Sequence, residues 1–246
     1  MNATPPTELL ARLREATHAL HREVERTDLM QCLIAGRLPL RDFCALQRNL
    51  HALYTALEAG LQRHAGLIQA LCPGWPEPSR LARCARLAAD LDHLQGPDWA
   101  AALPLVPAAR ALVARLNALD QSAPRQLLAH AYVRYFGDLA GGQLLARRVQ
   151  SAYGLPDAAG TSFYAFGPAD ATAALAQALR SALHGSRIDA GGVDALVAEA
   201  QRSFAQHAQM FTELAGAEAA PLTKAPHGMA TELQLTRSVG LAGSAG

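Results

Sequence analysis

The segment HAYVRYFGDLAGGQLLARR at residues 130–148 decides the fold, because it is helical at both ends and holds three glycines at its centre. The apolar pattern predicts one helix from about Pro124, a residue suited to a helix start, to about Tyr153. An interior glycine costs a helix about 1 kcal/mol relative to alanine. Such a cluster is expected where the backbone bends or comes very close to another body. The cluster consists of Gly137, Gly141 and Gly142.

Two explanations of this cluster stay open from the residues alone. A flat ligand lying across the helix would require small residues, and so would close packing against a second helix. Asp138 stands among the glycines and admits two readings of its own. Its carboxylate could organise water over such a ligand, or it could form an ion pair with Arg134 one turn earlier.

Elsewhere the apolar pattern is also helical, beginning with a first helix that carries Leu9, Leu13, Ala16, Leu20 and Val24 on one face and has Thr7 as its N-cap. Further helices are predicted at about 39–63, 81–94, 108–119, 168–184 and 192–215, with breaks at 72–78 and 154–156. No run of alternating β-branched residues predicts a strand. We therefore expect an all-α protein with one domain over residues 1–217 and a flexible or disordered tail over residues 218–246.

The first predicted helix has a second unusual face. Arg14, His18, His21 and Glu25 follow one another at spacings of four, three and four, which places them on one side of the helix. His21 borders the apolar stripe, where an imidazole can bind a metal through one nitrogen while Glu25 acts on the other. The alternative is a boundary histidine with an ordinary hydrogen bond, and spacing alone favours that alternative.

Composition excludes several classes of function. The 246 residues carry 22 Lys and Arg against 21 Asp and Glu, a balance that argues against nucleic-acid binding through a basic surface. No apolar run is long enough to span a membrane. The 4 cysteines are scattered, which argues against a zinc site and indicates free thiols in the cytoplasm. Nucleotide-binding, serine-hydrolase and zinc-protease motifs are missing, as are the carboxylate–histidine pairs of a di-iron bundle.

Two segments resemble the signature helices of the heme oxygenases: LREATHALHREVE at 13–25 and AYVRYFGDLAGGQLL at 131–145. Shorter family-like segments follow in the same order: ALYTALE at 52–58, PSRLARCARLAADL at 78–91, FYAF at 163–166 and AEAQRSFAQHAQMF at 198–211. The resemblance covers about residues 8–215. It implies a single helical domain that holds heme b, both cofactor and substrate, between a proximal and a distal helix.

The resemblance also implies a role for each matching residue. His21 matches the proximal iron ligand, and Glu25 matches the residue near its other nitrogen. The distal-helix positions are Gly137, Gly141 and Gly142, whose backbone passes over the heme, and Asp138, Arg134 and Tyr54, which hold a water network. Positions at the heme edge and walls are Tyr132, Arg180, Arg14, His18, Phe204 and Phe211. The chain departs from the family pattern at Ala176, where a lysine is common, and at His207, where an asparagine is common.

The activity implied by the resemblance is oxidative cleavage of heme at a meso carbon, with the α position favoured. The products would be biliverdin, ferrous iron and carbon monoxide, formed with O2 and external electrons. A ferredoxin or flavoprotein reductase would supply the electrons, because the chain has no flavin or nicotinamide motif. Arg147 and Arg148 could dock that donor or simply form a solvated face. A bacteriophytochrome is one conceivable acceptor of the biliverdin.

The resemblance is to the soluble, bacterial type of enzyme, because the weakly apolar tail carries Arg237 and resembles no membrane anchor. Two other functions stay open on the same fold. One is a heme-binding or heme-carrier protein that does not turn heme over. The other is a helical protein with a different ligand, as in thiaminase-like or di-iron proteins.

Overall fold

A computed structural model of the chain describes residues 9–216, and all the regular structure in that range is helical. The α-helices are α1 (Leu9–Glu25), α2 (Asp28–Ile34), α3 (Leu40–Arg63), α4 (Ala65–Leu71), α5 (Pro78–Leu81), α6 (Cys84–Gln95), α7 (Trp99–Ala102), α8 (Pro107–Ser122), α9 (Leu127–Tyr153), α10 (Ala169–His184) and α11 (Ala190–Gly216). Two short 3-10 helices, η1 (Pro124–Gln126) and η2 (Ser162–Tyr164), complete the set. The all-α prediction is therefore confirmed.

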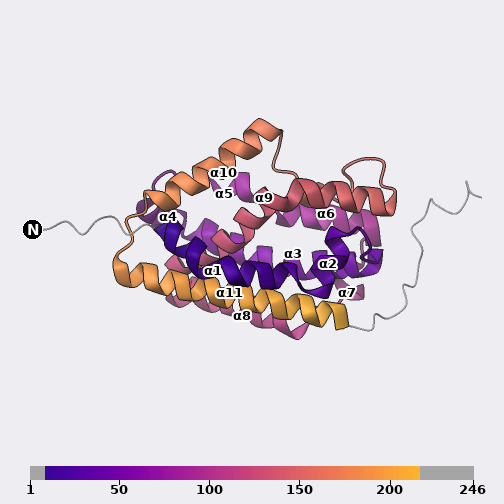
Figure 1. The fold of residues 1–246 in the computed structure, drawn as a ribbon, viewed down its shortest axis with the longest axis horizontal. Helices are drawn as coiled ribbons and strands as arrows, with labels where there is room; N and C mark the ends of the chain where they lie inside the picture. Colours follow the sequence, from indigo (N-terminus) through magenta and orange to yellow (C-terminus); the bar gives the residue numbers. More distant parts are fainter. Residues whose placement is uncertain (1–8, 217–246) are drawn as a thin grey trace, which may run out of the picture.

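The longest helices pack around one shared apolar core. Figure 1 shows α1 and α11 running side by side, so the first and last described helices are neighbours. α11 also packs against α8 and α9, and α3 packs against α6, α8 and α9. The apolar residues that recur at helical spacing along α3 are all buried, namely Phe43, Leu46, Leu50, Leu53 and Leu57. α11 thus joins the helix that carries His21 to the helix that carries the glycine cluster.

One predicted helix is interrupted. The pattern predicted a continuous helix over 81–94, but α5 ends at Leu81 and α6 begins at Cys84, with Ala82 in an extended conformation. The physical reason is the next residue. The Arg83 backbone N–H donates to Glu58 Oε1 at 2.5 Å, and its buried guanidinium donates to carbonyl groups far along the chain. A continuous helix would give up these bonds.

Other differences from the predicted elements are small. The helices α2, α4 and α7 were not predicted, and each has seven residues or fewer. α10 and α11 agree with prediction to within a turn. The predicted N-cap Thr7 and the predicted tail 218–246 lie outside the described residues. Within residues 9–216, no helix combines the length and the apolar character needed to cross a membrane.

Candidate functional site

The three central glycines of α9 fall into two classes by their surroundings. The helix runs through all of them without a break. A Cβ atom built on Gly142 would lie 3.4 Å from the Tyr164 side chain and from its carbonyl oxygen. A Cβ built on Gly137 or Gly141 would meet no neighbouring atom within 4 Å. Close packing therefore explains Gly142, whereas Gly137 and Gly141, one turn apart, form a smooth strip on which a flat ligand could lie.

Beside that strip lies a buried cluster of three polar side chains, which we call the distal cluster: Tyr54, Arg134 and Asp138. Arg134 Nη2 donates to Asp138 Oδ1 at 2.7 Å, and Arg134 Nε donates to the Tyr54 hydroxyl at 3.2 Å. The Tyr54 hydroxyl donates to Asp138 Oδ2. The predicted ion pair between Arg134 and Asp138 is present, and Tyr54 from α3 joins it. Both oxygens of Asp138 are therefore engaged, with a lone pair left on each.

Burial decides the electrostatics of the distal cluster. It raises the pKa of the Asp138 carboxyl, although the positive charge of Arg134 and the hydrogen bond from Tyr54 act in the opposite direction. Burial also raises the pKa of the Tyr54 hydroxyl well above its usual value. For Arg134, burial would lower the pKa, but the charge of Asp138 and the interactions with Tyr54 together more than offset it, and the net shift is upward. Asp138 thus takes up a proton more readily than a surface aspartate does.

On α1, the His21 side chain is half exposed and is oriented by two neighbours. Its Nδ1 atom lies 3.6 Å from Glu25 Oε2, which leaves Nε2 as the nitrogen away from the carboxylate. Its ring meets the buried ring of Phe204 edge-on, with centroids 6.0 Å apart. Arg14 and His18 are exposed on the same helix. Phe211, the other residue expected to form a heme wall, is buried. Its ring contacts the His207 ring, with centroids 6.2 Å apart, instead of the His21 ring.

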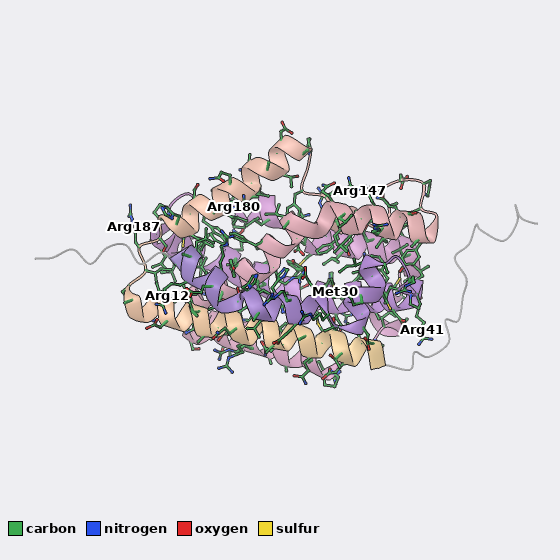
Figure 2. The ribbon with its side chains drawn as sticks, viewed as in Figure 1. Arg12, Met30, Arg41, Arg147, Arg180 and Arg187 are labelled. Carbon is green, nitrogen blue, oxygen red and sulfur yellow. The ribbon has the colours of Figure 1, made fainter. Side chains whose placement is uncertain are left out.

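Tyr132 and Arg180, the two positions expected near heme propionates, differ in exposure. Tyr132 is buried, with its hydroxyl 3.4 Å from the Thr17 hydroxyl, so it links α9 to α1. Burial raises the pKa of its hydroxyl. Arg180 is exposed on α10, where Figure 2 shows it toward the same end of the molecule as Arg12. Arg180 lines a small groove between α9 and α10 together with Phe136, Leu139, Ala140, Ala176 and Leu179.

Sequence reasoning missed a clamp that holds residues 162–165 against α9. Asp90 Oδ1 and Oδ2 accept hydrogen bonds from the backbone N–H groups of Ser162 and Phe163, both at 2.8 Å. The Arg83 guanidinium donates to the carbonyl oxygens of Phe163 and Ala165, at 3.0 and 2.8 Å. Held in this way, Tyr164 packs on Gly142. The family-like segments 78–91 and 163–166 were the signal, but no local pattern says that they touch.

Two further observations concern the surface and metal binding. Arg147 and Arg148 are exposed on α9 beyond the glycine cluster, and neither makes an ion pair within residues 9–216 (Figure 2 labels Arg147). The part of the chain that the structure describes contains no group of three or more His, Cys, Asp or Glu side chains placed to hold a metal ion.

Comparison with known proteins agrees with this arrangement. The family model "Heme oxygenase" matches residues 7–213. Heme oxygenase 2 of Synechocystis sp. is 35% identical over 214 residues, which cover 85% of this chain and 83% of that protein. Heme oxygenase 1 of Homo sapiens is 31% identical over 210 residues, covering 85% and 72%.

Solved structures of the same family share the fold. The crystal structure of heme oxygenase-1 from Synechocystis sp. PCC 6803 in complex with heme has a TM-score of 0.78 and 32% identity, covering 85% of this chain and 93% of that chain. Heme oxygenase-2 from the same organism, in complex with heme and NO, has a TM-score of 0.79 and 33% identity, covering 85% of each chain. With the family model matched across nearly all the described helices, the chain belongs to the heme oxygenase family.

Proposed function

We propose that this protein binds heme between α1 and α9 and cleaves it at a meso carbon, preferentially the α carbon, to biliverdin, ferrous iron and carbon monoxide. One observation carries the proposal. A buried carboxyl group with a raised pKa, Asp138, lies beside the strip of Gly137 and Gly141, where added side chains would meet nothing. Membership of the family and its heme-bound structures supports heme as the flat ligand.

The residues present fit heme. His21 supplies the single nitrogen ligand that a porphyrin iron takes from the protein, with Glu25 set to accept a hydrogen bond from Nδ1. His21 would hold the iron through Nε2, the nitrogen that lies away from Glu25. Bound heme supplies the iron that activates O2 and is itself the molecule oxidised. Phe204 keeps the His21 ring upright through its edge-on contact.

On the opposite side, the strip of Gly137 and Gly141 brings the α9 backbone against the ligand. A side chain at either position would fill space along the α9 backbone that a flat ligand would otherwise occupy. The proximity of the backbone would steer the reaction toward one edge of the ring. Small residues at these positions therefore serve regiospecificity as well as binding. This role explains why glycines stand in a helix that they destabilise.

The distal cluster handles protons. Asp138 uses its free lone pairs to hold water, and its raised pKa suits a carboxyl group that passes a proton to the reacting oxygen. Arg134 keeps the carboxylate compatible with burial, and Tyr54 fixes its orientation from α3.

The heme edge is assigned to cations and hydroxyls. Arg180 on α10 and Arg14 and His18 on α1 are exposed and available to propionates. Tyr132 adds a hydroxyl where α9 meets α1. Retention of Arg180 and Arg14 supports the α carbon as the site of cleavage, because these residues orient the ring within its pocket.

Electrons must come from a partner, for which we propose an acidic ferredoxin or a flavoprotein reductase that docks at Arg147 and Arg148. Support for this docking is their exposure without ion pairs in the described residues. A bacteriophytochrome is proposed as one acceptor of the product. We further propose a single domain over residues 1–217 and a cytoplasmic location, in keeping with the four free cysteines.

The test is an absorption titration with hemin, followed by a ferredoxin–reductase system in air and chromatography of the pigment. We expect one heme per chain, then loss of the Soret band with appearance of the α isomer of biliverdin. The variant His21→Ala should lose or alter the Soret spectrum, whereas His93→Ala, at an exposed histidine of α6 outside the site, should keep it. A stable Soret band under reduction would instead indicate a heme carrier. If titration with hemin gives no Soret shift, the proposal that this protein binds heme is wrong.

A further inference from the structure

A cavity of about 180 Å³ lies among α3, α4, α5 and α9, and none of the residues assigned to heme lines it. Its walls are mostly apolar, with Leu61, Ile68 and Leu81 among them. An apolar cavity of about 150 Å³ holds a benzene molecule in another protein. This cavity therefore has room for one ring with a short substituent, and exposed residues at its mouth, such as Gly66, leave it open to solvent.

Tyr135 of α9 brings a polar group to this apolar cavity. The residue is 1% exposed and lines the cavity, and its hydroxyl makes no hydrogen bond to any other residue in the range 9–216. Its ring packs against the Tyr54 ring, with centroids 5.9 Å apart. Buried hydroxyl groups are normally hydrogen-bonded, so the partner of this one must come from the cavity.

The charges around the cavity are all of one sign. Glu58 of α3 and Glu77, in the connection between α4 and α5, line it, whereas no lysine, arginine or histidine does. Neither carboxylate makes an ion pair within the described residues. Burial raises the pKa of Glu58, although the backbone N–H of Arg83 acts in the opposite direction. A cation in the cavity would therefore stabilise the ionised form of Glu58.

An aromatic side chain completes the lining. Trp75 is 4% exposed and stands in the connection between α4 and α5. Indole rings attract cations more strongly than other aromatic side chains do. An apolar wall, a buried carboxyl group, an unpartnered hydroxyl and an indole together favour a ligand with an apolar body and a positively charged end.

We propose that this cavity binds a small organic cation with an apolar body, of the class of arylamidinium and arylalkylammonium ions. The N–H groups of such a cation only donate, and the oxygens of Glu58 and Tyr135 can accept from them. The apolar body lies among Leu61, Ile68 and Leu81, while Glu77 adds negative charge at the mouth. The ligand is a free small molecule, because the cavity has the size of a single substituted ring.

Trp75 offers a direct way to observe binding. The chain has 2 tryptophans, so Trp99→Phe leaves Trp75 as the sole fluorescent indole. The full-length, heme-free protein with this substitution is titrated with benzamidine, benzyl alcohol and benzoate, three probes of similar size and different charge. We expect a saturable change in fluorescence with benzamidine at a Kd of about 1 mM. Benzyl alcohol should bind about tenfold more weakly, and benzoate should give no saturable change.

Variants then place the cation in the cavity. Glu58→Gln removes the charge but keeps an oxygen for the Arg83 N–H, and it should raise the Kd for benzamidine about tenfold. Tyr135→Phe should raise it about two- to fivefold, because only a neutral hydrogen-bonding group is lost. As a matched control, Glu15→Gln removes the charge of an exposed carboxylate on α1 and should leave the Kd unchanged.

Two results would overturn the proposal. One is the absence of saturable binding of benzamidine, or equal affinity for all three probes. The other is an unchanged Kd in both Glu58→Gln and Tyr135→Phe, which would place the cation elsewhere on the protein. If Glu58→Gln does not fold, Tyr135→Phe and the three probes decide the proposal. No measurement involves heme, so this proposal and the proposed function stand or fail separately.

Discussion

Two buried carboxyl groups, Asp138 on α9 and Glu199 packed against α9 from α11, have pKa values that their environments shift in opposite directions. Asp138 pairs with one guanidinium and one hydroxyl, and burial raises its pKa. Glu199 on α11 receives hydrogen bonds from His130 at 2.9 Å and from Arg115 at 3.1 and 2.6 Å, and its pKa is lowered to about 2. Burial opposes that shift, but the bonds from His130 and Arg115 outweigh it.

The contrast indicates that Glu199 has a structural role and Asp138 a chemical one. Glu199 stays ionised at any working pH and ties α11 to α9 and α8, which makes it a structural lock. Burial raises the pKa of Asp138 above its ordinary value, which is the direction that suits a group that moves protons. The two carboxyl groups differ because Glu199 accepts hydrogen bonds from His130 and twice from Arg115, whereas Asp138 accepts from one guanidinium nitrogen and one hydroxyl.

The largest expected effect comes from breaking the structural lock. Glu199→Ala leaves His130 buried without its acceptor and Arg115 without its partner, so we expect a loss of about 3–5 kcal/mol in the free energy of unfolding. Urea unfolding followed by circular dichroism measures it. As a control, Glu213→Ala on the same helix should cost less, because Glu213 bonds only to the Ala108 backbone N–H and to Gln209. Equal losses would contradict the assignment of Glu199 as the lock.

Acid should release the same lock. Because the pKa of Glu199 is lower in the folded protein, its stabilisation is fully present above the unfolded value near 4.5 and is lost as pH falls toward 2. At 1.36 kcal/mol per pKa unit, the shift from 4.5 to about 2 corresponds to a loss of about 3 kcal/mol in the free energy of unfolding. The stability gap between wild type and Glu199→Gln should therefore narrow over that range. Asp90 and Glu58 have raised pKa values and act with the opposite sign in both proteins, so the difference between the two isolates Glu199.

Replacing the other carboxylate should affect stability much less. Asp138→Asn removes a charge whose burial is unfavourable, while the amide oxygen can still accept from Arg134 and the amide N–H can donate to a reoriented Tyr54 hydroxyl. We expect the free energy of unfolding of the heme-free protein to change by about 1 kcal/mol or less, as measured from the shift in its thermal midpoint. A loss of unfolding free energy as large as that of Glu199→Ala would mean that Asp138 is also a structural lock. The proposed difference between the two carboxyl groups would then be wrong.

The smallest effect tests the surface beside Asp138. Gly141→Ala adds a methyl group that meets nothing, so it should stabilise the heme-free protein by about 0.5–1 kcal/mol through helix propensity. Gly142→Ala places its methyl group 3.4 Å from Tyr164 and should gain less. Heme titration should show weaker binding or altered regiospecificity for Gly141→Ala. Wild-type binding and products from Gly141→Ala would contradict the strip as a ligand surface.

Sequence patterns predicted the long helices because their information is local. The stripe from Phe43 to Leu57 repeats at helical spacing, and the helix that contains the glycines was predicted to within a turn. The break at Ala82 was missed because its causes lie elsewhere in the chain. Arg83 leaves the helix to bond with Glu58 and with the carbonyl oxygens of Phe163 and Ala165.

The candidate site divides in the same way. The pairs His21 with Glu25 and Arg134 with Asp138 follow from a spacing of four. The contact of Tyr54 with Asp138 spans 84 positions, and that of His130 with Glu199 spans 69. The contact between Tyr54 and Asp138 was expected only through the family resemblance, and the contact between His130 and Glu199 was not expected at all. Helical periodicity names the face of a residue but not the residue that it meets.

The measurement that tests the central claim most directly is a single turnover of the stoichiometric heme complex in air, for wild type, Asp138→Asn and Glu199→Gln side by side. We expect biliverdin from the wild type and from Glu199→Gln at a temperature where both are folded. From Asp138→Asn we expect the same heme binding but a rate of biliverdin formation lower by about a hundredfold or more. Biliverdin from Asp138→Asn at the wild-type rate would contradict the proposal that this buried carboxyl group delivers the proton.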